Sequence, residues 1–370
     1  MIYFIADHGF YECDNYPKLK NLSRNIQSKF DKKEEILLLG GDNFYPNGLE
    51  DYNLNYCVDK FNKCFQSIKH NIYGLLGNHD YIGNINYQLT GFNRDAAIKK
   101  SNMFNMPNKY YKIEYNNYDL YMLDTCIIDP QFSSDIYDII KQYKECKHYN
   151  EFTLCDYNIM VNAIKFMQEQ RNEQLKWLDK NLEETKKANK EAIVFGHYPI
   201  YTTGAYEFKK FNNQIFKYLI PLFIKHNVKL YVSGHDHCTL LQSLNMSTIK
   251  KIYELQFNDK LDNDSIIIEL FPEFYTYLND DYSEYKLYNI VSGACIDNYV
   301  KNQYISVIKS KSKCEIENIN IYENYVFNLY TRINITSNNI ICIDFLHNQN
   351  FTEHKSNIDK QYIAYSYILN

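Results

Sequence analysis

The chain has 370 residues, of which 45% are hydrophobic and 23% charged, and its formal net charge is −5. Such a length buries a substantial core and fits either one large domain or two average domains. Because lysine and arginine are scattered and show no excess, nucleic acids and anionic membranes are not indicated as partners. No apolar run approaches the roughly 18 residues of a membrane-spanning helix.

Cysteine usage and the start of the sequence bear on the cellular compartment. The ten cysteines are unevenly spaced and include no Cys-x-x-Cys pair, which argues against a zinc ribbon and against a dense disulfide framework. Residues 1–6 already have the apolar pattern of a strand and leave no room for a signal peptide. The sequence as written therefore predicts a cytoplasmic protein, or a secretory one if the start omits a leader.

Short apolar segments that predict strands recur along the chain, and each ends in a polar loop. Amphipathic stretches with helical spacing lie between several of them, for example at Leu22, Ile26 and Phe30. This alternation is typical of a layered α/β fold, in which loops beyond the carboxyl ends of the strands form the ligand crevice. In chain order, the predicted strands are 2–6, 36–39, 71–76, 120–123, 192–195, 229–232 and 288–291.

Two long stretches, 127–170 and 243–286, interrupt this rhythm and are predicted to be insertions. Further strands are expected at 325–333 and 340–345. Since no linker separates these parts, we expect one large domain over 1–370, with its core at 1–242 and 287–345.

Five short motifs follow predicted strands and carry most of the Asp and His residues of interest. Each alone is typical of a helix cap or a turn. Together they would bring carboxylates, a phenol, an amide oxygen and imidazoles into one crevice, the ligand types that two neighbouring cations need. If their segment is extended, His235 and His237 are expected to project to the same side and to serve one site. The motifs are Asp7-His8-Gly9, Gly41-Asp42-Asn43-Phe44-Tyr45, Gly77-Asn78-His79-Asp80, Gly196-His197-Tyr198-Pro199 and Gly234-His235-Asp236-His237.

In order and spacing, these motifs resemble those of the calcineurin-like metallophosphoesterases, and two details resemble the purple (tartrate-resistant) acid phosphatase branch. Gly9 stands where many other branches have a metal-binding His, and Tyr45 supplies a phenolate in its place. Shorter similar stretches include 107–111, Met122-Leu123-Asp124-Thr125, 174–178 and Ser292-Gly293-Ala294.

The resemblance implies a four-layer α/β/β/α sandwich and two metal ions, Fe(III) plus a divalent ion (Fe, Zn or Mn). One metal would be held by Asp7, Tyr45 and His237, and another by Asn78, His197 and His235. Asp42 would bridge the two.

The resemblance also implies a hydrolase that cleaves phosphate monoesters by a metal-activated hydroxide. His79 is the candidate general acid for the leaving group, and Asp80 is expected to orient it. The expected substrate is a phosphorylated small molecule or a phosphoprotein. The oligomeric state does not follow from the sequence.

The sequence departs from the family pattern at three places. Tyr206 stands where animal relatives have a second substrate-facing His. His8 stands where relatives often have a bulky aromatic residue, and it is expected either to contact the site or to pack. The stretch 127–170, with Cys126, Cys146 and Cys155 on or beside it, is a candidate lid.

Two other functions compete with the monoesterase. One is a phosphodiesterase or nucleotide-directed hydrolase on the same scaffold. The other is a non-catalytic scaffold, which the intact ligand positions and His79 disfavour. A protein Ser/Thr phosphatase is disfavoured by Gly9 and Tyr45, because those relatives carry a His at the first position and lack the tyrosine ligand.

Overall fold

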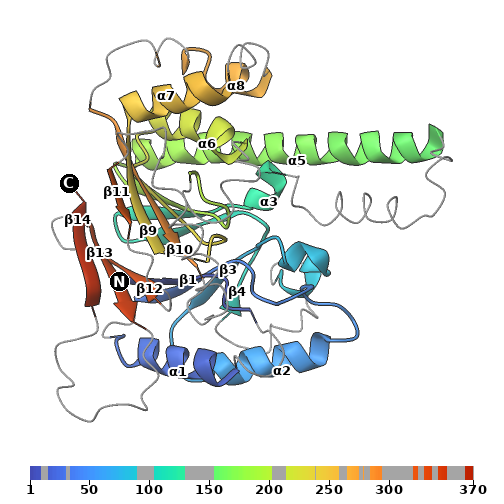
Figure 1. The fold of residues 1–370 in the computed structure, drawn as a ribbon, viewed down its shortest axis with the longest axis vertical. Coiled ribbons are helices and arrows are strands. Elements are labelled where there is room, and N and C mark those ends of the chain that lie inside the picture. Colours follow the sequence, from blue (N-terminus) through green and yellow to red (C-terminus); the bar gives the residue numbers. More distant parts are fainter. Residues whose placement is uncertain are drawn as a thin grey trace, which may run out of the picture.

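The computed structural model describes residues 1–9, 16–30, 34–89, 104–129, 154–201, 214–237, 239–257, 265–274, 278, 284–293, 320–323, 329–335, 341–347 and 363–369. In these residues, two seven-stranded sheets face each other, and helices cover the outer face of each sheet (Figure 1). The predicted four-layer α/β/β/α sandwich is confirmed.

The first sheet is built around β1, β2 and β3, which run parallel to one another. Their sequences are nearly continuous apolar runs, as expected for strands covered on both faces. Strands from the end of the chain extend this sheet, since β12 pairs antiparallel with β1. The spatial order is β14 (Ile363–Leu369), β13 (Ile341–His347), β12 (Leu329–Ile335), β1 (Ile2–Ile5), β2 (Ile36–Gly40), β3 (Ile72–Leu75) and β4 (Phe104–Asn105).

The second sheet has parallel strands β6, β7, β8 and β10 at its centre and antiparallel strands on both sides. It packs against the first sheet through side chains such as Phe4 and Phe195, whose rings stack with centroids 5.9 Å apart. The order is β11 (Asn320–Glu323), β9 (Thr239–Asn245), β10 (Lys286–Ser292), β8 (Leu230–Ser233), β7 (Glu191–Phe195), β6 (Tyr118–Met122) and β5 (Tyr111–Tyr115).

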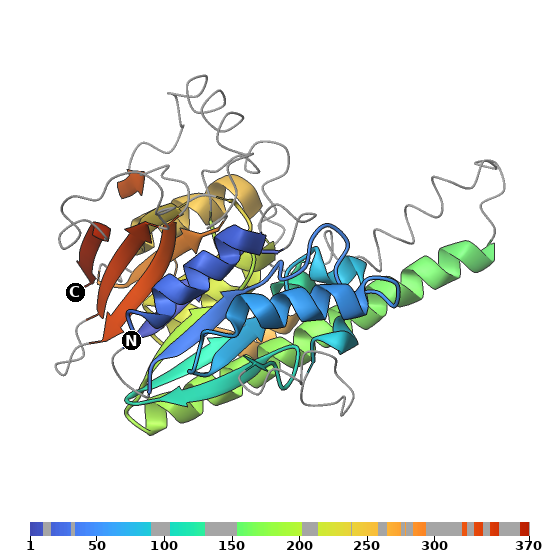
Figure 2. The same cartoon turned by 90° about the horizontal axis from the view of Figure 1, so that it is seen from below.

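Helices α1 (Tyr16–Gln27) and α2 (Leu54–Phe65) cover the first sheet, while α5 (Leu154–Lys187) and α6 (Gln214–Lys225) cover the second. Helix α2 buries Val58, Phe61 and Phe65, each stabilising the fold by about 1.5–3 kcal/mol relative to an exposed position. Figure 2 shows α5 projecting beyond the sheets.

The remaining helices lie at the two interruptions and beside the site. In the stretch 243–286, the chain forms two helices between the antiparallel neighbours β9 and β10. In 127–170, the described part belongs to α3 and to the start of α5. Within the described ranges, no helix has both the length and the apolar character that crossing a membrane requires. These helices are α3 (Thr125–Ile128), α7 (Met246–Phe257), α8 (Ser265–Leu270) and the 3-10 turns η1 (Asp80–Ile82) and η2 (Ile85–Tyr87).

Candidate metal centre

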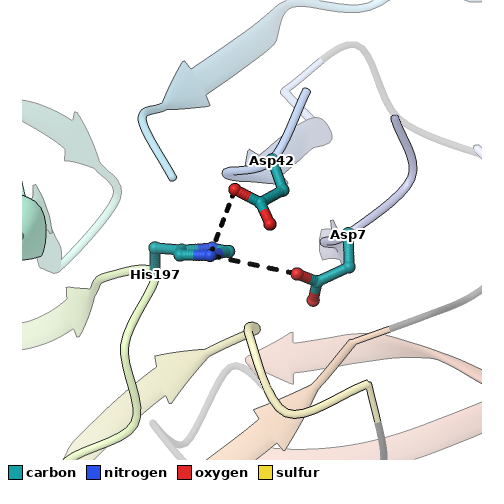
Figure 3. Close-up of side chains that lie close together, drawn as sticks. All are labelled: Asp7, Asp42 and His197. Atoms are coloured by element: carbon teal, nitrogen blue, oxygen red, sulfur yellow. Dashed lines mark ion pairs between the residues drawn. The ribbon is translucent and has the colours of Figure 1, made fainter. Parts of the chain in front are cut away.

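All seven predicted ligands lie in loops that follow the carboxyl ends of β1, β2, β3, β7 and β8, so both sheets contribute to one site. At its centre are three buried side chains, Asp7, Asp42 and His197, whose ligand atoms lie within 4.8 Å of one another. The His197 Nε2 atom is 3.4 Å from Asp42 Oδ1 and 3.9 Å from Asp7 Oδ1. Figure 3 shows the three side chains pointing toward one another.

Tyr45 lies on one side of this centre. Its hydroxyl is 2.9 Å from Asp42 Oδ2, 3.5 Å from Asp7 Oδ1 and 3.0 Å from the Nε2 atom of His237. That same His237 nitrogen is 3.6 Å from Asp7 Oδ1. A carboxylate, a phenol and an imidazole therefore converge here, with the Asp42 carboxylate beside them.

Asn78 and His235 lie on the other side, next to His197. The Asn78 Oδ1 atom is 3.1 Å from His197 Nε2, and the rings of His197 and His235 have centroids 5.2 Å apart. The His197 Nδ1 atom donates to the Gly40 carbonyl at 2.9 Å, so Nε2 is the ring atom that faces the centre. Burial acts to lower the pKa of His197, but the carboxylates of Asp42 and Asp7 outweigh it and raise that pKa to about 9. A metal ion would therefore have to displace the Nε2 proton to bind there. Asn78 and His235 therefore lie next to His197, whereas Tyr45 and His237 lie next to Asp7.

The two central carboxylates have no lysine or arginine within ion-pair distance in the described part of the chain. Burial is the largest effect on Asp7 and raises its pKa. Burial also acts to raise the pKa of Asp42, but the charge and hydrogen bond of His197 outweigh it and lower that pKa. Among the described residues, histidines are the only side chains that bring positive charge to these two carboxyl groups.

Several ligand residues adopt left-handed backbone conformations, which cost about 1–3 kcal/mol each for residues other than glycine. The φ angles are 53° for Asp7, 54° for Asp42, 69° for His235 and 49° for His237. Hydrogen bonds hold these turns, including one of 2.9 Å from the His235 amide to Asp7 Oδ2. The backbone is thus fixed in the conformation that aims the ligands inward.

Gly77 and Gly293 allow close approach to the carboxylates. A Cβ atom on Gly77 would collide with the Asp42 side chain, and one on Gly293 would collide with the Asp7 carboxylate. Gly77 directly precedes Asn78 in its motif, and Gly293 belongs to the Ser292-Gly293-Ala294 stretch. Both glycines therefore serve the site by lacking a side chain.

His79 lies beside Tyr45, with ring centroids 4.4 Å apart, and its Nδ1 atom is 2.6 Å from the Pro46 carbonyl oxygen. We expected Asp80 to orient this imidazole, and the structure corrects that expectation. The buried Asp80 carboxylate instead accepts hydrogen bonds from the amides of Asn43 at 3.0 Å and Gly77 at 2.9 Å. Asp80 therefore ties together the loops that carry Asp42 and Asn78.

His8 is fully buried. Its ring packs edge-on against Phe65 of α2, at 5.9 Å between centroids. Neither ring nitrogen has a hydrogen-bond partner among the described residues, and burial lowers the pKa of His8 to about 3. Of the two expectations for this residue, the structure shows packing.

A sequence model of the calcineurin-like phosphoesterases matches residues 1–239, which contain every predicted ligand and His79. The chain belongs to the calcineurin-like phosphoesterase family. The family and the relatives described next imply two metal ions. The donor set found here, with oxygen and imidazole ligands on both sides of a shared carboxylate, fits such a pair.

Curated relatives of this phosphoesterase confirm the resemblance to purple and tartrate-resistant acid phosphatases. Tartrate-resistant acid phosphatase type 5 of Rattus norvegicus and of Homo sapiens are 27% and 26% identical over 242 residues, 63% of this chain and 63% of each relative. Purple acid phosphatase 3 of Arabidopsis thaliana is 28% identical over 208 residues, 55% of this chain and 49% of the relative. The matched part thus spans about half to two thirds of these relatives.

Solved structures share the fold of this phosphoesterase. GAP50, described as the anchor in the inner membrane complex of Plasmodium, aligns with a TM-score of 0.54 and 17% identity over 100% of this chain and 88% of that one. Purple acid phosphatase PPD1 from yellow lupin aligns with a TM-score of 0.50 and 12% identity over 94% of this chain and 51% of that one.

Some sequence predictions fall on residues outside the described ranges, namely Tyr206, Cys146 and positions 130–153 of the candidate lid. Other contributors to the site were not predicted at all. The Gly40 and Pro46 carbonyls hold imidazoles through the main chain, so no side chain could have signalled them. Gln88, which donates to Asp80 at 3.0 Å, follows no recognisable motif.

Proposed function

We propose that this chain hydrolyses phosphate monoesters at a two-metal centre that contains a ferric ion bound by Tyr45. The observation that carries the proposal is the place of the Tyr45 hydroxyl, within 3.5 Å of Asp7, Asp42 and His237. A phenol among two carboxylates and an imidazole becomes an anionic oxygen ligand when it loses its proton, and a hard trivalent cation favours such a ligand.

In this proposal, Asp7, Tyr45 and His237 hold the ferric ion. Asn78, His197 and His235 hold a divalent ion of iron, zinc or manganese, and Asp42 is shared. Two carboxylates and one phenolate contribute a charge of −3, so a ferric and divalent pair leaves the site at +2. A phosphate dianion is then attracted to the site although the chain as a whole carries −5.

When bound, the metal ions supply Lewis acidity toward the phosphoryl oxygens and a nucleophile. The chain itself supplies the proton for the leaving group. The His79 Nδ1–H group donates to the Pro46 carbonyl at 2.6 Å, which fixes the ring and leaves Nε2 to carry the transferred proton. The half-buried position of His79 suits contact with an alkoxide leaving group of a phosphorylated small molecule or a phosphoprotein.

A visible absorption spectrum with metal analysis, on the wild type and on Tyr45→Phe, tests the proposal. We expect about two metals per chain and a broad visible band that Tyr45→Phe abolishes. Tyr121→Phe is the matched control, because this buried tyrosine bonds Thr185 and has no described contact with a predicted ligand, so its loss should leave the band unchanged. Two metals without a band would contradict a tyrosinate-bound ferric ion.

Activity assays separate the competing functions. Faster cleavage of a mono-aryl phosphate than of a bis-aryl phosphate supports the monoesterase, and the reverse supports the phosphodiesterase. The likeness to GAP50 shows a shared fold alone. A folded wild type that binds no metal would favour a non-catalytic scaffold.

A further inference from the structure

Asp124 and Thr125 lie directly after β6 and are fully buried, yet neither belongs to the predicted ligand set. The Thr125 Oγ1 atom accepts hydrogen bonds from two consecutive backbone amides, those of His197 at 3.1 Å and Tyr198 at 3.0 Å. These amides belong to the loop after β7. Thr125 therefore fixes the main chain from which the His197 imidazole extends.

Asp124 makes the corresponding contact to the other sheet. Its carboxylate accepts from the hydroxyl of Tyr81, a residue of η1 that lies three positions after Asn78. The Gln174 side chain of α5 bonds both the amide and the carbonyl of Asp124, at 2.8 and 2.9 Å. Asp124 thus joins the Asn78 loop of the first sheet to β6 and α5 of the second.

These two contacts meet at the metal centre. Thr125 holds His197, Asp124 holds the turn that follows Asn78, and the Asn78 Oδ1 and His197 Nε2 atoms are only 3.1 Å apart. By contrast, no described hydrogen bond connects Asp124 or Thr125 to the Tyr45 side of the centre. Asp124 and Thr125 therefore support the ligand group of Asn78 and His197 and not the group that contains Tyr45.

We propose that Asp124 and Thr125 are positioning residues for the divalent ion alone, and that the ferric ion is positioned independently of them. The inference rests on the proposed function, because it assumes the two ligand groups described above. Residues that hold metal ligands from outside typically contribute 10–100-fold to metal affinity. Losing the Thr125 hydroxyl should therefore weaken the divalent site and leave the tyrosinate-bound ferric site intact.

Thr125→Val tests this role, because valine keeps the shape of threonine and removes the acceptor of both amides. Zn²⁺ is titrated into protein whose divalent site has been emptied while the visible band is retained. We expect Thr125→Val to bind Zn²⁺ about 10–100-fold more weakly than the wild type, with the band unchanged. Thr125→Ser, which keeps the hydroxyl, should restore the wild-type affinity.

Tyr81→Phe provides a second variant in case Thr125→Val does not fold. It removes the hydroxyl that reaches Asp124 and should also weaken Zn²⁺ binding without altering the band. Tyr121→Phe again serves as the control for the loss of a buried tyrosine hydroxyl.

Three outcomes overturn the inference. Unchanged Zn²⁺ affinity in both variants would show that the pair does not position the divalent site. A parallel loss of Zn²⁺ affinity and of the band would show that it supports the whole centre. A wild type without a band or metals would overturn the proposed function as well, so the wild-type spectrum separates the two failures.

Discussion

Buried carboxylates occur at both ends of the strands, but the side chains that surround them differ between the two ends. Asp119, at the amino end of β6, lies 3.4 Å from Lys112 Nζ and 3.1 Å from Lys190 Nζ. Asp7 and Asp42, at the carboxyl ends of β1 and β2, have histidine, tyrosine and backbone amides as their described neighbours. A carboxylate that the chain neutralises with lysine serves the fold, whereas one left without a fixed cation is available to a metal ion.

The pKa values of the carboxyl groups also differ between the two ends of the strands. Burial raises the pKa of Asp119, but hydrogen bonds from Thr185 and Lys190 outweigh it, so the pKa lies below its ordinary value. Asp119 therefore stabilises the fold above the unfolded pKa of 3.8, and this contribution is lost as the pH falls through the lowered folded value. Burial raises the pKa of Asp7, so its charged form costs stability until a cation binds.

The strongest test of this comparison replaces one aspartate from each end by asparagine. Asp42→Asn removes the negative charge that the two metal ions are proposed to share, so activity should fall by more than about a hundredfold. Such a loss exceeds the effect on metal affinity or activity that is typical of residues supporting a metal ligand from outside. Asp119→Asn should keep both metals and activity while losing about 1.5–3 kcal/mol of unfolding free energy through its charged hydrogen bonds. Metal analysis, kinetics and denaturant unfolding check both variants, and equal metal loss in the two would contradict the division.

Metal removal is expected to destabilise the wild type. A ligand present at a hundred times its dissociation constant stabilises the folded state by about 2.7 kcal/mol. Chelation should therefore lower the melting temperature of the wild type and leave that of Asp42→Asn nearly unchanged. Identical shifts in both proteins would mean that the chelator does not act through this centre.

Two buried histidines also differ in whether the fold gives their imidazole a hydrogen-bond partner. His226 bonds Asp179 through Nε2 at 2.7 Å, whereas His8 has no described partner and a pKa of about 3. Below pH 6.5 the unfolded state binds a proton that folded His8 cannot, so stability falls as the pH drops from 6.5 toward 3. In chelated protein, the wild type should lose about 1.6 kcal/mol of unfolding free energy between pH 6.5 and 5 through His8, and His8→Phe should abolish this loss. Denaturant unfolding at the two pH values measures it.

His226→Phe is the matched control for that experiment. It removes a bonded imidazole and leaves the Asp179 carboxylate without one of its donors, so it should destabilise the protein at both pH values. If His8→Phe leaves the pH dependence of the wild type unchanged, His8 titrates normally in the folded state and our account of it is wrong.

The smallest expected effect concerns the left-handed backbone. Away from the site, such conformations fall on asparagine, as at Asn189 and Asn227 after α5 and α6, while at the site they fall on ligands such as His237. Asparagine tolerates this region better than histidine does. In chelated protein, His237→Gly should be about 1 kcal/mol more stable than His237→Ala. Equal stabilities would show that the turn is not strained.

The sequence was most informative where strands are covered on both faces. The seven strands predicted between residues 2 and 291 all correspond to observed ones, because parallel strands such as β1 and β2 need nearly continuous apolar runs. By contrast, β9 and β5 were not predicted. Polar residues interrupt the apolar pattern of these two strands. Their place in the sheet depends on the strands with which they pair, which the local sequence does not reveal.

The site was predictable to the extent that side chains form it. Asp7, Tyr45 and His237 were expected together because candidate metal ligands are limited to particular residue types, and the structure places their side chains side by side. The partner of His79 was missed, since a backbone carbonyl leaves no trace in the sequence, and neighbouring Asp80 was chosen in its place. The role of Thr125 depends on two amides that only the fold brings to it.

Strand β1 precedes the other described strands of its sheet in the order of synthesis, but its pairing on both edges is completed late. Ile2 lies opposite Ile36 on one edge and opposite Ile333 on the other. While the chain is being translated, the second edge of this wholly apolar strand has no partner until β12 leaves the ribosome. Exposed edges of this kind invite aggregation, and pairing over such a distance is slow. Because Asp7 follows β1 closely, the loop that carries this candidate ligand extends from a strand whose second edge is paired late in synthesis.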